Sequence, residues 1–193
     1  VVAGACSGVA SIQTQDAFSN IPNVGADSTA NLSGTTATFF TDSGCTTSAS
    51  SVTVTNGTSS QSFYFNATAA GSLTLTAASA GLTSGTQAET ITAAAATKLI
   101  ISTTAQTLSA GSCSSAITVQ ALDTYNNDTA VGSSTTVNLS GAGASFFTDS
   151  LCSTSTSSVT MSSGSGTQNF YVTGAAAGSL TVSIAATGLT GDS

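Results

Sequence analysis

Short stretches in which hydrophobic and polar residues alternate recur along the chain. In the C-terminal half, the alternating stretches are Ile117–Ala121, Val137–Leu139, Val159–Met161, Phe170–Val172 and Leu180–Ile184, and two apolar runs stand at Lys98–Ser102 and Phe146–Phe147. A period of two is typical of strands that bury one face, and turn-forming residues separate the stretches about every 10 residues. About seven such strands in roughly 100 residues predict an all-β, immunoglobulin-like antiparallel β-sandwich.

An internal repeat with a period of 107 residues relates the two halves of the chain. At this offset Cys6 corresponds to Cys113 and Cys45 to Cys152, and no gap is needed between residues 1 and 86. Longer matching strings pair 39–43 with 146–150, 31–34 with 138–141, and 71–74 with 178–181. A match of this length predicts that the same sandwich occurs twice, as two tandem immunoglobulin-like domains.

The repeat also predicts where the two domains divide. The first domain is expected at 1–86, and the second, a whole period, at 87–193 with a linker over 87–97. The alanine-rich stretch Ala93–Ala96 is short and flanked by threonine, which favours an extended linker over a helix. Because the first copy lacks the 21 residues that correspond to 87–107, we expect the segment to be an excerpt from a longer array.

The first domain is therefore expected to lack its first strand. In the second domain, residues 97–107 are predicted to supply that strand, with Leu99 and Ile101 facing the core. Losing two buried aliphatic side chains costs roughly 3–6 kcal/mol, which is comparable with the stability of a small domain. We expect a preceding unit or a neighbouring copy to fill the gap. A core near Ile12 and Leu73 that the domain's own residues close would contradict this expectation.

Each repeat contains two cysteines that are 39 positions apart. The duplicated spacing predicts a disulfide within each domain, Cys6–Cys45 and Cys113–Cys152, and four buried free thiols are the alternative. Closing a loop of this length stabilises a fold by roughly 4 kcal/mol in the chain-entropy model. A zinc site is excluded, because two cysteines without histidine do not supply four ligands.

Charged side chains are scarce in the sequence. One lysine, no arginine, seven aspartates and one glutamate give a net charge of −7, and 71 of the 193 residues are serine or threonine. A chain with one cation cannot neutralise phosphates, which argues against nucleic acids and anionic membranes as partners. No apolar run approaches the roughly 18 residues of a membrane span, so no membrane insertion is expected. The composition is that of an extracellular or cell-surface protein.

The residue type that enzymes use most often as a general base is missing. Histidine does not occur in the chain, so no imidazole can activate a serine or cysteine nucleophile. We therefore expect a protein without catalytic residues, metal or cofactor. The repeated acids allow a calcium site or simple turn capping, and capping is favoured because each repeat offers few carboxylates. These acids are Asp16 and Asp42 in the first repeat and Asp123 and Asp149 in the second, with Asn20 and Asn127 nearby.

Several longer strings resemble a known family. They are AGSCSSAITVQALDTYNN (110–127), TTVNLS (135–140), FFTDSLCST (146–154) and SLTVSIAATGLT (179–190), and the first repeat carries the same set. They look like the tandem bacterial Ig-like (Big-type) repeats of large secreted and surface proteins, across nearly the whole chain and both cysteine positions. The resemblance implies a β-sandwich that serves as a rigid spacer in adhesins, stalks or filaments, and it implies no catalytic residues.

Two kinds of modification have candidate residues. Five Asn-X-Ser/Thr sequons give weak candidates for N-glycosylation at Asn31, Asn56, Asn66, Asn127 and Asn138. The only lysine, Lys98, could form an isopeptide bond with Asn169, although an ordinary lysine that guards a strand edge is favoured.

Two functions remain open at the level of sequence. The first is a structural segment whose partners are other copies of itself or adjacent repeats, in a filament or array. The second is an adhesive or glycan-binding module, which needs exposed aromatic side chains. The candidates for outward-facing aromatics are Tyr64, Phe65, Tyr125 and Tyr171.

Overall fold

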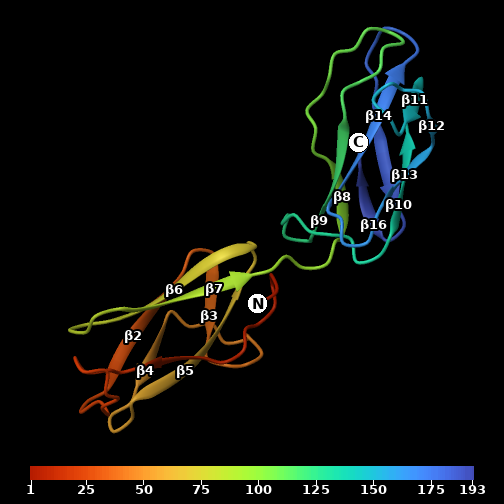
Figure 1. Ribbon diagram of the computed structural model, residues 1–193. Helices are drawn as coiled ribbons and strands as arrows, with labels where there is room; N and C mark the ends of the chain where they lie inside the picture. Colours follow the sequence, from red (N-terminus) through yellow and green to blue (C-terminus); the bar gives the residue numbers. More distant parts are fainter. The chain divides into compact units, whose positions relative to one another are not determined.

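The computed structural model describes residues 1–193 and contains two compact units, Val1–Ala93 (unit 1) and Ala94–Ser193 (unit 2). Both units consist of β-strands joined by turns and loops, and neither contains a helix (Figure 1). No segment forms a helix that is long and apolar enough to cross a bilayer. The predicted all-β, immunoglobulin-like sandwich is thus confirmed as the fold class.

Unit 1 is a sandwich of two antiparallel sheets. One sheet has the strand order β1-β5-β3 and the other β4-β2-β6-β7. Its strands are β1 (Ala10–Gln13), β2 (Ser28–Ser33), β3 (Ala37–Phe40), β4 (Ser51–Val54), β5 (Ser60–Ala67), β6 (Gly71–Ser79) and β7 (Gly85–Ile91). The strands β1 and β7 each form one edge of their sheet, and β3 and β4 form the opposite edges.

The core of unit 1 lies between these two sheets, because alternate side chains of each strand point inward. Leu32, Leu73 and Leu75 project from one sheet onto Phe39 and Phe63 of the other. The rings of Phe39 and Phe63 pack with centroids 6.0 Å apart, a favourable aromatic separation.

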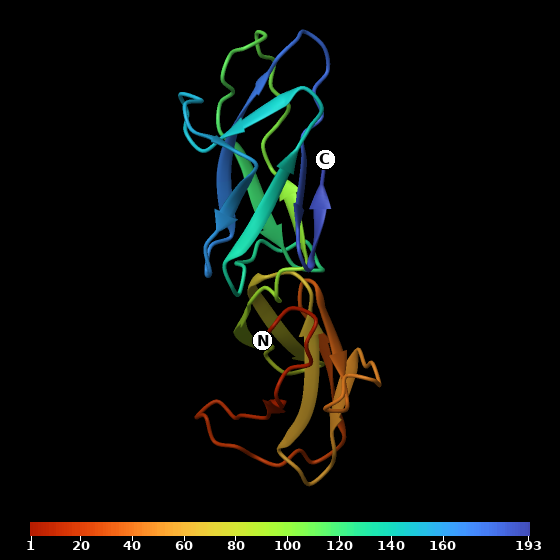
Figure 2. The same cartoon turned by 90° about the vertical axis from the view of Figure 1, so that its right-hand side faces the viewer.

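Unit 2 repeats this sandwich with two additional strands, one of which lies between its two sheets. Its strands are β8 (Lys98–Ile101), β9 (Ile117–Leu122), β10 (Thr135–Ser140), β11 (Ala144–Phe147), β12 (Ser155–Thr156), β13 (Ser158–Met161), β14 (Thr167–Gly174), β15 (Ser183–Ala186) and β16 (Leu189–Asp192). The strand β8 pairs antiparallel with β9 and parallel with β16 (Figure 2). It thereby joins all nine strands into one continuous hydrogen-bonded order.

The core of unit 2 includes the strand that unit 1 lacks. Leu99 is 1% exposed and belongs to the central cluster with Phe146 and Phe170, whose rings lie 6.0 Å apart. Ile101 packs against the same cluster, whereas Ile100 does not contribute to it. The predicted inward direction of Leu99 and Ile101 is confirmed.

The boundary between the units differs from the one expected at 86/87, and the expected linker 87–97 is too long. Strand β7 runs across that boundary and pairs with β6 from Gly71↔Ile91 to Ala77↔Gly85. Unit 1 therefore extends to Ala93, and the irregular segment between β7 and β8 is 92–97. Ala93–Ala96 forms neither helix nor strand, so the sequence was right to favour a linker over a helix.

One predicted strand is shorter than its alternation suggested. Leu180 and Val182 lie before β15, outside any strand, whereas their repeat counterparts Leu73 and Leu75 lie within β6. The difference follows from pairing. Strand β7 pairs with the start of β6, whereas β16 pairs with β15 only from Ile184↔Asp192 to Ala186↔Leu189.

Candidate functional site

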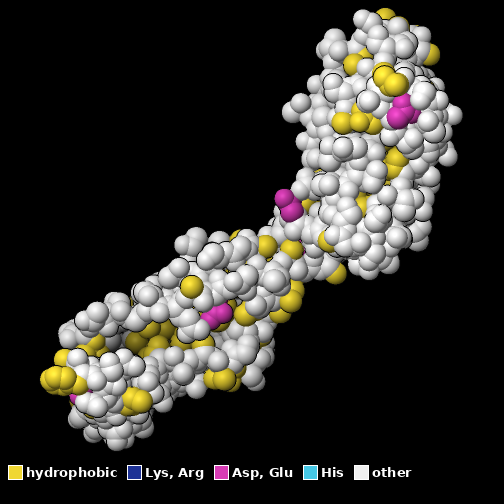
Figure 3. Space-filling view, viewed as in Figure 1, with side chains coloured by type: hydrophobic (Ala, Val, Ile, Leu, Met, Phe, Trp, Pro, Cys, Tyr) yellow, Lys and Arg dark blue, Asp and Glu magenta, His cyan; other side chains and the backbone are white.

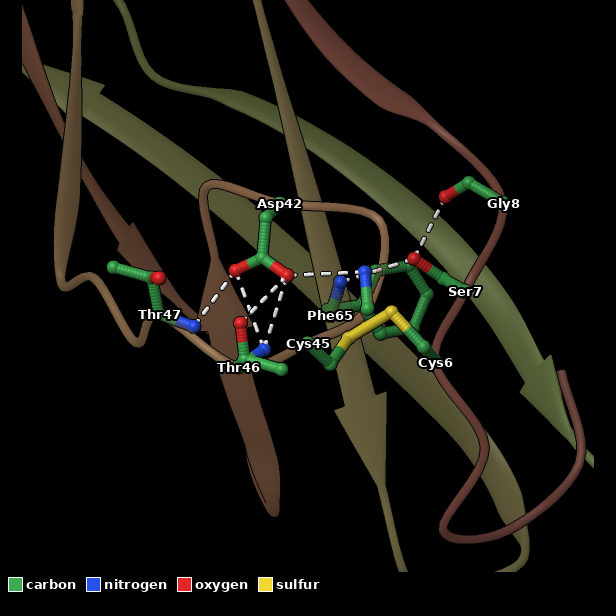
Figure 4. Close-up of a disulfide and its surroundings, with 9 residues drawn as sticks. Cys6, Ser7, Gly8, Asp42, Cys45, Thr46, Thr47 and Phe65 are labelled. Carbon is green, nitrogen blue, oxygen red and sulfur yellow. Dashed lines mark hydrogen bonds between the residues drawn. A yellow bond between two sulfur atoms is a disulfide. The ribbon is translucent and has the colours of Figure 1, made fainter.

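The feature that both units share most completely is a disulfide-closed loop (Figure 4). In unit 1, Cys6 lies before β1 and Cys45 lies in the loop after β3, with an S–S distance of 2.04 Å and Cα atoms 5.7 Å apart. Cys113 and Cys152 are joined in the same way in unit 2, with an S–S distance of 2.00 Å and the same Cα separation. In unit 1 the bond encloses β1, β2 and β3 in one covalent loop.

A buried serine follows the first cysteine of each pair and attaches this segment to the neighbouring strand. The Ser7 backbone N–H donates to the Phe65 carbonyl at 2.8 Å, and the Phe65 N–H donates to Ser7 Oγ at 3.0 Å. Ser114 makes the same pair of bonds with Val172. The sequence analysis missed this role, although the duplicated Cys-Ser dipeptide was a usable signal. The serine fixes the position of the adjacent sulfur.

The second cysteine lies in a loop that a carboxylate holds in place. Asp42 Oδ1 accepts hydrogen bonds from the backbone N–H groups of Gly44 and Thr46, at 3.0 and 3.1 Å, and from the Thr46 hydroxyl. Asp42 Oδ2 accepts from the Thr47 N–H at 2.7 Å (Figure 4). Cys45 has a positive φ of 52°, a conformation that non-glycine residues rarely adopt. The carboxylate thus stabilises the turn that directs Cys45 towards Cys6.

Asp149 repeats this arrangement in unit 2. Its oxygens accept from the backbone N–H groups of Leu151, Ser153 and Thr154, and Cys152 has a φ of 51°. Backbone hydrogen bonds from Thr47 and Thr46 lower the pKa of Asp42 to about 2, and those from Ser153 and Thr154 lower the pKa of Asp149 to about 2. Both side chains are therefore ionised at neutral pH, and they act as loop caps.

Asp16 and Asp123 cap a second duplicated loop, which follows β1 in unit 1 and β9 in unit 2. Each carboxylate accepts from the backbone N–H two residues on and from both the backbone and the side chain of an asparagine four residues on. The Asn20 side chain is the main cause that lowers the pKa of Asp16. Burial opposes ionisation of Asp123, but bonds from Asn127, Ala94 and Tyr125 outweigh it and lower its pKa. The arrangement is the turn capping that the sequence favoured over calcium.

The structure places no three ionisable or thiol side chains together in a way that could hold a metal ion. Among the sequon residues, Asn31, Asn56 and Asn138 are exposed, whereas Asn66 and Asn127 are half-buried. The Nδ2 atom of Asn127, to which a glycan would be attached, donates to Asp123. Glycosylation stays a prediction for all five.

The single lysine and the aromatic candidates are distributed over separate strands and loops. Lys98 Nζ donates to Asn126 Oδ1, and Asn169 instead accepts from the Thr118 hydroxyl, so the structure does not bring Lys98 and Asn169 together as an isopeptide pair. The expectation that Phe65 faces outward is wrong, because it is 2% exposed and belongs to the core. Strand alternation places it on the same face as Phe63.

An open cleft lies between the edge strands β1 and β7 of unit 1. It has a volume of about 670 Å³, and its edges include residues 11–15 and 83–87. Leu32, Phe39, Phe63 and Leu75 of the core line its interior. Figure 3 shows a hollow with hydrophobic atoms at its floor on this unit. Leu73 is buried in the part of β6 that pairs with β7, but Ile12 borders the cleft, so the core is closed at Leu73 and open at Ile12.

Unit 2 has a cleft at a different place. It has a volume of about 720 Å³ and lies between the 103–110 loop and residues 178–182. At the repeat offset, residues 178–182 correspond to the part of β6 that pairs with residues 87–91 of β7 in unit 1. The two units thus differ in which strand covers the core.

Comparisons with known proteins give likenesses among solved structures only. No family model and no curated protein matches the sequence. The chain is similar to domains 4 and 5 of the S-layer protein SbsC, with 16% identity over 66% of either chain and a TM-score of 0.34. It is also similar to the adhesin InvE of Yersinia pseudotuberculosis, with 14% identity over 100% of this chain and 55% of that one and a TM-score of 0.40.

A third likeness is to a glycosyl hydrolase family 2 member from Bacteroides cellulosilyticus. The match has 16% identity, covers 98% of this chain and 28% of that one, and has a TM-score of 0.42. The chain spans less than two thirds of the length of each of these three structures. Likeness at these scores assigns no activity, substrate or partner.

Proposed function

We propose that the chain is a non-catalytic structural segment of an extracellular bacterial surface protein, in which it forms part of a stalk or filament. The observation that carries the proposal is the duplication of one covalently closed unit. Both units repeat the disulfide, the serine beside it and the aspartate-capped loop at the same 107-residue offset. Repetition of a disulfide-closed sandwich suits a protein that sets a distance.

The chemistry of the acids that occur in both repeats supports the same role. A general acid needs a pKa near the working pH, whereas the pKa values of Asp42 and Asp149 are lowered to about 2 by backbone donors. Their four oxygens hold loops instead of facing a substrate. Disulfides persist in oxidising compartments, which supports an extracellular location.

The proposal is tested by changing the number of repeats. One, two and four copies of the 107-residue period are inserted between an outer-membrane anchor and a fluorescent module, and the height of the fluorophore above the membrane is measured. A structural spacer raises the height by a constant increment for each added period. A height that does not change with repeat number would refute the stalk.

A binding role is the second candidate, because an aromatic side chain stands exposed at the same position of both units. Phe18 is 87% exposed and its repeat counterpart Tyr125 is 41% exposed, each in the loop capped by Asp16 or Asp123. Exposed aromatic rings suit stacking on sugars. A glycan array that gives a signal lost in Phe18→Ala and Tyr125→Ala, but kept in the exposed control Leu151→Ala, would favour adhesion over a plain stalk.

A further inference from the structure

The cleft of unit 1 lies where unit 2 holds its first strand. In unit 2, β8 pairs with β9 alongside Val119 and Ala121, and both of these side chains are completely buried. Their counterparts in unit 1 are Ile12 of the edge strand β1 and Thr14, the residue after β1, and both are only half-buried. The repeat thus exposes in one unit the positions that it buries in the other.

Both walls of the cleft have the register that a strand of this kind requires. In unit 2, Lys98–Ile101 pairs with residues 119–122, and Thr190 of β16 pairs with Lys98. At the 107-residue offset these partners correspond to residues 12–15 and to Thr83. Residues 12–15 and Thr83 all line the cleft of unit 1. An incoming strand therefore finds an antiparallel partner in β1 and a parallel partner before β7.

The interior of the cleft matches the side chains of such a strand. Leu99 packs in unit 2 against a cluster that contains Leu139, Phe146 and Phe170. The counterparts of these three residues in unit 1 are Leu32, Phe39 and Phe63, which line the cleft. The site thus offers an apolar pocket for an inward-facing leucine.

A carboxylate at the end of the cleft provides one more point of attachment. In unit 2 the Ala94 backbone N–H, which precedes β8, donates to Asp123 Oδ2 at 2.9 Å. Asp16 also lines the cleft and has the same hydrogen bonds to its own loop as Asp123. It is exposed, whereas Asp123 is completely buried. An incoming segment with a backbone N–H four residues before its lysine would complete the same interaction.

From these four correspondences we infer that the cleft of unit 1 is a strand-acceptor site for another copy of this repeat. The occupant is an extended segment with the chemistry of Lys98–Ser102, which docks antiparallel to β1 with its leucine in the apolar pocket. This inference rests on the proposed structural role and names its partner. It makes the repeats themselves the ligands of one another through β-strand addition.

The first test uses the full 193-residue chain and a fluorescently labelled peptide of residues 94–107. Fluorescence anisotropy should show saturable one-to-one binding, and hydrogen exchange of the backbone amides in residues 11–15 should slow. A peptide with Leu99→Asp should bind at least about tenfold more weakly, the factor expected for losing one buried aliphatic side chain. The matched control peptide, Ile100→Thr, should bind like the unchanged peptide, because Ile100 lies outside the core cluster.

The second test supplies the strand within the same chain. A copy of residues 87–107 placed directly before Val1 should raise the denaturant midpoint of unit 1 and abolish peptide binding. The same fusion with Leu99→Asp in the added copy should do neither.

Four outcomes overturn the inference. The first three are no saturable binding, equal binding of the Leu99→Asp peptide, and protection confined to residues 178–182 of unit 2. Self-association of the chain that the peptide does not affect also overturns it, because the copies would then pair through another surface. Failure here leaves the constant height increment per period untouched, so the two proposals fail separately.

Discussion

When force is applied to the two ends of the chain, the residues inside each disulfide loop should add to the contour length only after the bond is removed. In the oxidised chain, the backbone between Cys6 and Cys45 cannot extend, because the bond carries the load across Cα atoms 5.7 Å apart. The double variant Cys6→Ala/Cys45→Ala removes this bypass in unit 1. The double variant Cys113→Ala/Cys152→Ala does the same in unit 2 and serves as the matched comparison.

The magnitude follows from the sequence separation. Both bonds span 39 residues, and an extended backbone gains about 3.4 Å per residue. Each double variant should therefore lengthen the fully unfolded chain by about 130 Å, and reduction of both bonds by about 260 Å. The altered unit should also unfold at lower force, because opening a loop of this size removes about 4 kcal/mol in the chain-entropy model.

Single-molecule force spectroscopy with tethers at both termini measures these contour lengths directly. The untreated chain should give the short length and gain both increments only after a reductant is added. If the untreated chain already releases the full length, the bonds do not form. If the two double variants lengthen the chain by different amounts, the two bonds do not enclose loops of equal length, which contradicts the assigned pairing.

Three other measurements test the assigned contacts. Leu99→Ala should destabilise unit 2 by about 2–5 kcal/mol in chemical denaturation, because Leu99 is 1% exposed within the core; Ile100→Ala should cost clearly less, and equal costs would contradict the assigned facing. Asp42 and Asp149 have pKa values lowered from 3.8 to about 2, so they stabilise the folded state above pH 3.8 and lose this contribution as the pH falls through about 2. The melting temperature should therefore fall with pH in this window, and Asp42→Asn/Asp149→Asn should flatten the curve; an unchanged slope would contradict the loop-capping role. Peptide mass mapping without reductant should recover the pairs Cys6–Cys45 and Cys113–Cys152, and free thiols or a bond between the units would disprove this connectivity.

Alternation predicted the strands whose two faces have different surroundings. Strands β2 and β10 show the same alternation of exposed and buried side chains, and their sequences alternate accordingly. Strand β7, with the sequence GTQAETI, has mostly exposed side chains and little apolar content, so the sequence predicts a linker from residue 87 onward instead of this strand. Its backbone is a strand because β6 pairs with it, and the sequence of β7 alone contains no signal of that pairing.

Pairing with distant residues also explains the other differences between the predicted and the observed structure. Leu180 and Val182 have the alternation of their counterparts in β6, yet they form no strand because β16 does not reach them. For Phe65, three consecutive aromatic residues, Phe63-Tyr64-Phe65, do not indicate which face of the strand is buried. The pairing of β5 with β1 and β3 determines it. At the disulfide site, the spacing of the cysteines was readable, whereas the bonds of Ser7 to Phe65 join residues 58 positions apart.

The disulfide in each unit also changes what a break in the backbone would do. The exposed loop 14–27, which joins β1 to β2, lies wholly between Cys6 and Cys45, and its counterpart 123–134 lies between Cys113 and Cys152. Exposed loops are the preferred sites of proteolytic nicking. A cut in either loop leaves its two fragments joined through the sulfur atoms, so the chain as a whole stays in one piece. Each unit thus has a second covalent connection across this loop. A repeat array built this way keeps the segments on either side of a cut loop joined.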